Sequence, residues 1–238
     1  GTGDNTLSVG FALGGAGTSG SGAVLLRGVG PGLSAFGVGG ALADPLMTVF
    51  QGTTQVAAND DWAGGFDFSS VGAFNFAGTP PRDAAIHNPA LPANSYSIQI
   101  LGKNSTTGIA LAEIYSATPD AAFSGTTPRL VNVSARTQVG TGDEILITGF
   151  VIVGTAPLRV LVRAVGPTLQ AFGVGGVLAD PKLDLFRGSA RIAENDNWDA
   201  ATAATFAGVG AFAFTPGSRD AALVATLEPG AYTAQVSG

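Results

Sequence analysis

The chain has 238 residues and a formal net charge of −6, and it contains no cysteine and one histidine. The lack of cysteine excludes a disulfide framework, thiol catalysis and a zinc-finger site, and the acidic charge argues against binding to nucleic acid or an anionic membrane. The longest apolar stretch, "EILITGFVIVG", is about half as long as the roughly 20 residues of a spanning helix. Low charge with abundant glycine, alanine, threonine and valine is typical of secreted bacterial β-proteins, so we expect an extracellular or cell-surface location.

Two copies of one long repeat make up most of the chain. The first begins "TGDNTLSVGFALGG" and the second "TGDEILITGFVIVG". Both continue through "VAANDDW" or "IAENDNW" and "PRDAAI" or "SRDAAL", and they end at "SYSIQILG" or "AYTAQVSG". Self-similarity of this kind predicts one structural unit per copy.

The glycine-rich stretch 27–45, "RGVGPGLSAFGVGGALADP", has the look of a phosphate-binding loop, in which glycines let the backbone approach a pyrophosphate. The second copy tests this interpretation, because the same stretch reads "RAVGPTLQAFGVGGVLADP" there. Gly28 and Gly32 are replaced by Ala164 and Thr168, and the retained glycine is followed by a proline, which has no N–H to offer an anion. The repeat therefore argues against nucleotide binding.

Short alternating segments bounded by glycine or proline predict strands throughout both copies. "SIQI" lies at the end of the first copy, and "TTGIALAEIY" (106–115) follows as its last strand. "RLVNVSARTQV" (129–139) is the predicted first strand of the second copy, in which "LRVLVRAVG" (158–166) shows the clearest alternation.

Helix is expected to be minor. "PTLQAFGV" begins with a proline that suits a first helical turn, and "DAATAATFAG" has Asp199 as its cap. Short strands with frequent turns predict an all-β fold of two tandem antiparallel β-sandwiches, jelly-roll-like, with short helical turns. Each sandwich is expected to bury apolar strand residues, among them Val131, Val133 and Leu158.

The predicted units are residues 1–117 and 129–238, joined by a linker at 118–128 that is rich in proline, serine, threonine and glycine. With these boundaries the first copy lacks a first strand and the second lacks a last strand. The missing strands lie elsewhere in a longer chain or come from neighbouring molecules, as in donor-strand complementation. Unpaired sheet edges promote association, so the predicted partners are copies of the chain or adjacent repeats.

Charged residues at equivalent positions of the two copies are predicted to hold the structure together. The first copy has few charges and most of them recur, whereas purely solvated charges would drift between copies. Arginine and carboxylate pairs that are partly buried fix geometry through bidentate contacts. With the tryptophan that follows each acidic turn, the predicted structural set is Arg27, Asp44, Trp62, Arg82, Asp83, Arg163, Asp180, Trp198, Arg219 and Asp220; Asp4 and Asp143 recur as well.

The turns "NDDW" and "NDNW" offer a calcium site as an alternative. Calcium takes several oxygen ligands from carboxylates, amides and carbonyls. The candidate ligands are Asn59, Asp60, Asp61, Asn195 and Asp196. Asx residues also cap turns routinely, and the sequence has no EF-hand loop, so structural capping is the favoured interpretation and no other cofactor is predicted.

Two aromatic positions and one histidine decide between binding and catalysis. Trp62 and Trp198, if exposed, would stack on sugars as in a carbohydrate-binding module; the favoured interpretation is that each indole covers the end of its core. His87 has no titratable counterpart in the second copy, and without a second base or metal ligand no Ser–His–Asp set can be assembled. We therefore predict no enzymatic activity.

The motifs "RAVGPTL", "IAENDNW", "GSRDAAL" and "PGAYTAQVSG" together resemble a glycine-rich β-sandwich repeat of very large secreted bacterial proteins. "NDNW" and "PGAYTAQVSG" are also loosely similar to bacterial pre-peptidase C-terminal domains, which are jelly-roll sandwiches on exported proteins. The resemblance implies an extracellular location, a structural or adhesive role and no catalytic residue. The expected function is that of a structural segment of a filament, stalk or surface layer; the alternative is a carbohydrate- or calcium-dependent binding module of a secreted protein.

Overall fold

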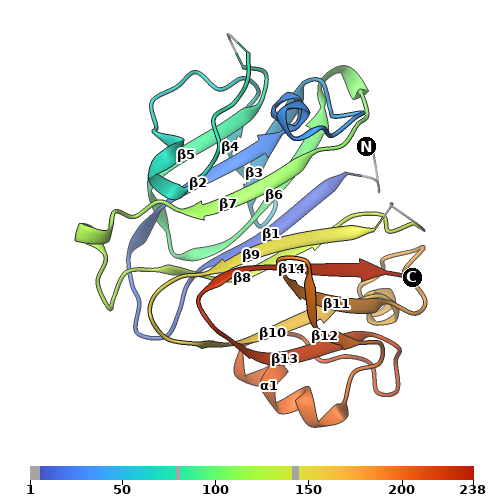
Figure 1. Ribbon diagram of the computed structural model, residues 1–238. Coiled ribbons are helices and arrows are strands. Elements are labelled where there is room, and N and C mark those ends of the chain that lie inside the picture. The colour runs from blue at the N-terminus through green and yellow to red at the C-terminus, as the bar shows by residue number, and fades with distance from the viewer. Residues whose placement is uncertain (1–5, 79–80, 141–144) are drawn as a thin grey trace. The chain divides into compact units, whose positions relative to one another are not determined.

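The computed structural model describes residues 6–78, 81–140 and 145–238. The chain divides into two units, Gly1–Thr137 and Gln138–Gly238, which we call the first and second unit (Figure 1). Strands dominate both units, and the ladders between the described strands are antiparallel. In this part of the chain, no helix has the length and apolar character needed to cross a membrane. The predicted fold of two antiparallel β-sandwiches is confirmed.

The first unit is a sandwich of a five-stranded and a three-stranded sheet. Its strands are β1 (Leu7–Gly14), β2 (Ser21–Val29), β3 (Pro45–Gln51), β4 (Thr54–Asn59), β5 (Ala84–Pro92), β6 (Asn94–Gly102), β7 (Leu111–Ser116) and β8 (Arg129–Arg136), and its 3₁₀ helices are Pro31–Phe36, Phe68–Val71, Lys103–Ser105 and Asp120–Ala122. The strand orders are β4-β3-β6-β1-β8 and β5-β2-β7. Both β1 and β2 therefore have a neighbour on each side.

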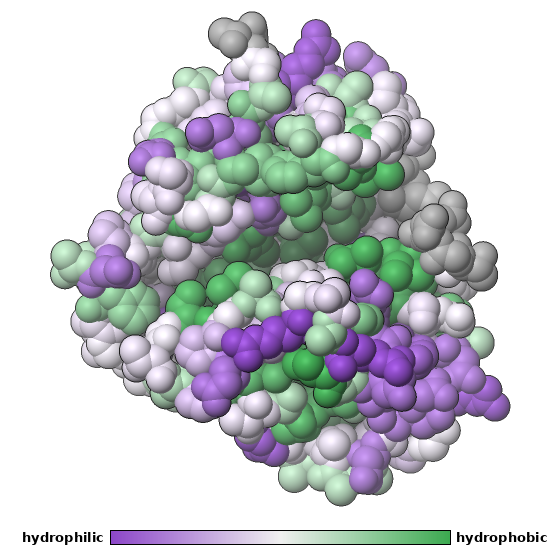
Figure 2. Space-filling model, viewed as in Figure 1, coloured by the Kyte–Doolittle hydropathy of each residue, from purple (hydrophilic) through white to green (hydrophobic). Residues whose placement is uncertain are grey.

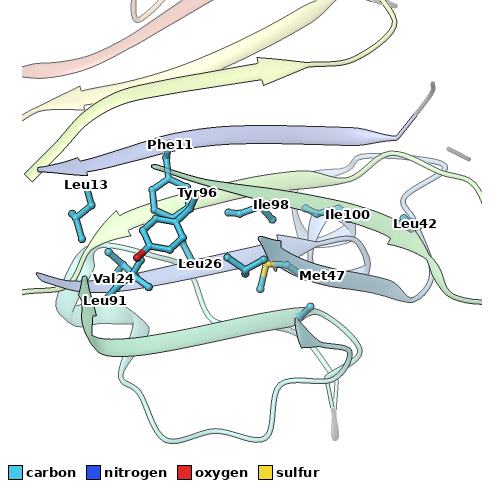
Figure 3. Close-up of a cluster of buried hydrophobic side chains, with 12 residues drawn as sticks. Phe11, Leu13, Val24, Leu26, Leu42, Met47, Leu91, Tyr96, Ile98 and Ile100 are labelled. Carbon is cyan, nitrogen blue, oxygen red and sulfur yellow. The ribbon is translucent and has the colours of Figure 1, made fainter. Parts of the chain in front are cut away.

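Alternation along β1 places one side of the strand in the core between the sheets. Val9, Phe11 and Leu13 are buried, while the residues between them are partly exposed. Phe11 stacks on Tyr96 of β6 with ring centroids 5.4 Å apart, and Figure 3 shows the two rings beside the aliphatic side chains of this core. The Tyr96 hydroxyl donates to the carbonyl of Pro92, which satisfies its polar end.

β2 is buried on both faces, as its continuous apolar run "AVLL" indicates. Val24 and Leu26 face the core between the sheets, whereas Leu25 packs on the opposite side, under a loop rich in aromatic residues. In that loop Phe68 is buried, and Trp62 packs against it at a centroid distance of 5.2 Å. The three-stranded sheet is therefore the middle one of three layers.

The second unit repeats this plan with fewer strands. Its strands are β9 (Leu146–Ile152), β10 (Leu158–Ala164), β11 (Lys182–Arg187), β12 (Ala190–Asn195), β13 (Ala221–Leu227) and β14 (Gly230–Ser237); its helices are the 3₁₀ segments Pro167–Phe172 and Ala200–Thr202 and the α-helix α1 (Ala203–Gly208). The strand orders are β12-β11-β14-β9 and β10-β13. Leu183 and Tyr232 lie in the core between the sheets, and Phe206 belongs to the outer aromatic layer. Asp199 accepts the N–H of Ala201 as the predicted cap.

The strand Arg129–Arg136 lies in the first unit, whereas the sequence placed it in the second. β8 pairs with β1, from Ser8 opposite Arg136 to Gly14 opposite Arg129. Alternation identifies a strand but not its partner, and so it does not reveal this pairing. The consequence is that β7 covers β2 and β8 covers β1 in the first unit, while β9 and β10 each pair on one side only in the described chain.

Three residues predicted to lie in a core are exposed. Val131, Val133 and Leu158 have exposed fractions of 55%, 49% and 54%. They belong to β8 and β10, which are outermost strands of their sheets and so lack a covering neighbour on one side. In β8 it is Leu130 that packs against the core of the first unit.

Candidate functional site

The repeated aspartate of "PRDAAI" occupies the glycine-rich loop of its own unit. Asp83 is fully buried, and its carboxylate accepts the N–H of Gly30 at 2.8 Å and that of Gly32 at 3.1 Å. These two N–H groups, from the residues on either side of Pro31, converge on one carboxylate as the N–H groups of an anion-binding nest do. The nest is thus filled by an anion of the chain itself, which gives a physical reason why this loop is not a nucleotide site.

Asp220 fills the equivalent loop of the second unit with more partners. Its carboxylate accepts the N–H of Gly166 at 2.7 Å, the N–H of Thr168 at 3.2 Å, and the hydroxyls of Thr168 and Ser218. Thr168 stands where the first unit has Gly32, so the replaced glycine adds a hydrogen-bond donor to the same carboxylate.

The glycine that both loops retain is required by a close approach of two backbone segments. A Cβ on Gly30 would lie 2.1 Å from the carbonyl oxygen of Leu42, and one on Gly166 would lie 2.1 Å from that of Leu178. Neither contact leaves room for a side chain. The repeated Gly-Pro pair is therefore explained by packing.

The repeated arginine of β2 lies in a cage of three phenylalanine rings. The guanidinium of Arg27 is 4.6, 4.4 and 4.4 Å from the ring centroids of Phe68, Phe74 and Phe76. Its exposed fraction is 0%, and it forms an ion pair with Glu113 of β7 at 3.3 Å. Burial lowers the pKa of Arg27, and the Glu113 carboxylate opposes this shift. A buried cation needs such a partner, because its desolvation is costly.

Arg163 lies in the matching cage of the second unit without a carboxylate partner among the described residues. Its guanidinium is 5.0, 4.3 and 4.5 Å from the ring centroids of Phe206, Phe212 and Phe214. It donates to the carbonyl of Phe212 at 2.6 Å. Burial lowers the pKa of Arg163, and the negative charge of Asp220 opposes this shift.

Two of the repeated pairs are ion pairs at the surface. Arg82 contacts Asp44 at 3.3 Å, and Arg219 contacts Asp180 at 2.6 Å. Both arginines are mostly exposed, so each pair contributes roughly 0–1 kcal/mol. The remaining recurrent charges, Asp4 and Asp143, lie outside the described residues.

The candidate calcium ligands divide into aspartates, two of which lie in a carboxylate cluster of the first unit, and asparagines, which bind the backbone. Asp60 and Asp61 lie with Asp44 in a cluster whose carboxylate oxygens are within 4.8 Å of one another. The ammonium of Lys103 donates to Asp60, which raises the pKa of that lysine. This cation compensates part of the negative charge that calcium would otherwise neutralise.

The asparagines of these turns serve the backbone. Asn59 accepts the N–H of Ala85 at 2.9 Å and donates to the carbonyl of Asp61. Asn195 makes the same two contacts, with Ala222 and Asn197, in the second unit. There the neighbouring Asp196 is exposed. The asparagine oxygens are thus already occupied as turn-capping acceptors.

Both tryptophans and the histidine pack against the aromatic layer. Trp62 is half-buried beside Phe68, and Trp198 is half-buried between Phe206 and Phe214, at 5.7 and 5.5 Å. His87 of β5 stacks on Phe66 at 4.2 Å. Burial lowers the pKa of His87 below its ordinary value of 6.5.

The feature that distinguishes the two units is the free side of β10. Val24, Leu25 and Leu26 of β2 are fully buried between β5 and β7. Their counterparts on β10, residues 160–162, are only half-buried, because among the described strands none covers the side that β7 covers in the first unit. Figure 1 shows β2 with β7 beside it.

β9 has a free side as well, and its exposed residues are larger than those of its counterpart. Ile147 and Val151 have exposed fractions of 58% and 66%. The equivalent residues of β1 are Ser8 and Ala12, on a strand that β8 covers. Figure 2 shows apolar residues that reach the molecular surface beside strongly hydrophilic ones.

Sequence reasoning did not identify several residues of this arrangement. Glu113 and Lys103 occur in only one copy, so the repeat gave no signal for them. The phenylalanines of "VGAFNF" and "VGAFAF" do recur, and this recurrence could have marked the cages.

The structure defines a tandem antiparallel β-sandwich protein in which β1 and β2 of the first unit pair on both sides, whereas their counterparts β9 and β10 pair on one side in the described chain. Comparisons with protein-family models, with curated proteins and with solved structures found no match for the chain. The resemblance to secreted bacterial repeats therefore stays a prediction.

Proposed function

We propose that the chain is a non-enzymatic structural segment of an extracellular bacterial filament, stalk or surface layer, and that it assembles through β-sheet edges. One observation carries the proposal: in the described chain β9 and β10 pair on one side only, whereas β1 and β2 pair on both. A strand with unpaired N–H and C=O groups is a template for pairing with another strand.

The chemistry of the β9 edge supports this role. Edges that must not associate carry charged residues or proline, but β9 reads "LITGFVI" and presents Ile147 and Val151 to solvent. Pairing with another strand would bury these side chains together with the free backbone groups. At about 25 cal/mol per Å² of apolar area, such burial favours association.

The charged residues support a structural rather than a catalytic role. Arg27 and Asp83 are fully buried and bound to other parts of the first unit. In the second unit Asp220 is likewise fully buried and bound to its loop, and the half-buried Arg163 donates to the carbonyl of Phe212. Buried charged side chains that are bound within their own unit in this way stabilise the sandwich and do not face a substrate.

The experiment is analytical ultracentrifugation of the chain over a wide range of concentration. We expect association that increases with concentration and that is reduced in the double variant Ile147→Lys/Val151→Lys, because charges on an edge strand oppose pairing. The control is Val209→Lys, which places a lysine at an exposed apolar position directly after α1, outside the strands.

Two results would contradict the proposal. One is a chain that stays monomeric at every concentration. The other is association to the same extent in the double variant and in the control.

A further inference from the structure

We propose that the free side of β10 binds an extended polypeptide strand that has the residue pattern of β7, with a carboxylate placed to pair with Arg163. This inference rests on the proposed function, because it concerns one of the same open edges. It goes further by stating the chemistry of the partner: a strand with the order small–acidic–aliphatic–aromatic, antiparallel to β10.

The first unit supplies the template. β7 runs antiparallel to β2 with Ala112 opposite Gly28, Glu113 opposite Arg27, Ile114 opposite Leu26 and Tyr115 opposite Leu25. Ala112 and Ile114 pack against the core between the sheets. Glu113 and Tyr115 lie on the other face, where the Tyr115 hydroxyl donates to Glu113 at 2.6 Å.

β10 presents nearly the same surface to an incoming strand. The counterparts of Leu25 and Arg27 are Leu161 and Arg163, and they lie in the same outer aromatic layer. On the inner face, Val162 replaces Leu26 and packs partly against the core of the second unit. The half-buried state of these residues is the state that β2 would have if β7 were removed.

The charge of Arg163 selects the acidic residue. In the first unit the caged guanidinium faces Glu113 at 3.3 Å. In the second unit the cage is present, but the strand that would carry the carboxylate is not among the described strands. A cation held in a cage of rings gains most from an added carboxylate, because the low-dielectric surroundings strengthen the attraction.

The occupant is a strand other than the β7 of the chain itself. That β7 already pairs with β2, and the described residues hold one β7–β8 segment for two sandwiches. Exchange of β7 between two copies would therefore open one site for each site that it filled.

The test adds the strand as a synthetic peptide. A peptide with the sequence of residues 106–120, "TTGIALAEIYSATPD", is titrated into the full 238-residue chain, and hydrogen–deuterium exchange locates its binding. We expect the amides of β10 to become protected, while those of β2, already covered by β7, keep their exchange rates. A peptide with Ile114→Pro cannot complete the ladder and is expected to give no protection.

The role of the carboxylate is tested by a pair of peptides and a pair of chains. The Glu113→Gln peptide is expected to bind about tenfold more weakly or worse, because a charge-assisted contact is lost. Against the chain variant Arg163→Met, which keeps the packing but removes the charge, the two peptides are expected to bind equally. This cycle isolates the pair from the rest of the strand.

The outcomes separate this inference from the proposed function. The inference is overturned if saturating peptide leaves β10 unprotected, or if the Glu113→Gln peptide binds the unaltered chain as tightly as the parent. If assembly nevertheless depends on Ile147 and Val151, the proposed function stands although strand binding at β10 is disproved. If the peptide binds β10 but the chain never associates, the strand site stands and the filament proposal falls.

Discussion

The carboxylate of Asp83 accepts a hydrogen bond from the backbone N–H of Gly30 at 2.8 Å, in the loop whose glycines suggested a phosphate site. A buried carboxylate thus takes the position of a ligand anion. Because Asp83 directly precedes β5 and Gly30 follows β2, the contact fixes the loop between β2 and β3 to the start of the neighbouring strand of the same sheet.

Removal of that carboxylate should destabilise the first unit strongly. Asp83→Ala leaves the buried N–H groups of Gly30 and Gly32 without an acceptor and removes a negative charge near Arg27, so we expect a loss of about 3–5 kcal/mol in the free energy of unfolding. The measurement is urea denaturation followed by the fluorescence of Trp62 in a Trp198→Phe background.

The control for Asp83→Ala is Asp67→Ala. Asp67 caps an exposed 3₁₀ helix through Ser69, and its loss is expected to cost about 1 kcal/mol. Equal effects of the two substitutions would show that the buried nest has no special importance for stability.

The retained glycines permit a matched pair of substitutions in each unit. Gly30→Ala and Gly166→Ala force a Cβ against a backbone carbonyl at 2.1 Å, and we expect each to cost about 2 kcal/mol or more. Gly39→Ala and Gly175→Ala place the same methyl group where nothing lies within 4 Å, so they should be nearly neutral. Thermal unfolding of the four variants checks this, and similar melting temperatures for all four would contradict it.

Stability should fall as the pH drops below the ordinary pKa of histidine. Because burial lowers the pKa of His87, the unfolded chain binds its proton more readily than the folded chain. The stabilisation of the folded chain that comes from keeping His87 neutral is fully present above pH 6.5 and decreases progressively below it. Below the lowered pKa of the folded state the free energy of unfolding no longer changes through this group. The expected NMR titration of this single histidine has a midpoint below 6.5.

His87→Val is the matched control, since Val224 stands at the equivalent position of the second unit. Free energies of unfolding between about pH 5 and pH 8 should decline less steeply toward acid in this variant. A parallel decline in both proteins would mean that other groups cause the pH dependence.

Calcium should leave the stability of the chain unchanged. The ammonium of Lys103 lies against Asp60, so the cluster with Asp44 and Asp61 already contains a cation. We expect the same melting temperature in calcium chloride and in a chelator, with magnesium as the control for ionic strength. A rise specific to calcium would favour the calcium-dependent binding module instead.

The sequence was sufficient to predict the repeat, the sandwich class and the recurrent charges, because each leaves a local or duplicated pattern. It was not sufficient to predict which strands pair. The alternation in β8 predicted that Val131 and Val133 face the core, yet both are exposed, and it is Leu130 that packs on the core of the first unit. A register irregularity between Ala12 and Leu13 of β1 lies opposite this part of β8, and such a bulge leaves no mark in the sequence of the partner strand.

Glu113 shows a second kind of limit. Nothing near it in the chain identifies its partner, because Arg27 is far away in sequence and the pair forms only when β7 lies beside β2. The free sides of β9 and β10 could not be predicted for the same reason, because they depend on which strands pair with each other.

The pairing of β8 with β1 also determines when the first sandwich can be completed during synthesis. Among the described strands of its unit β1 is made first, and its outer partner β8 is made last. Contacts between such distant segments form slowly, because a long loop must close before they are gained. Until then β1 carries the same kind of free edge that β9 has in the described chain, so the first unit of a nascent chain passes through a state that is open to mispairing.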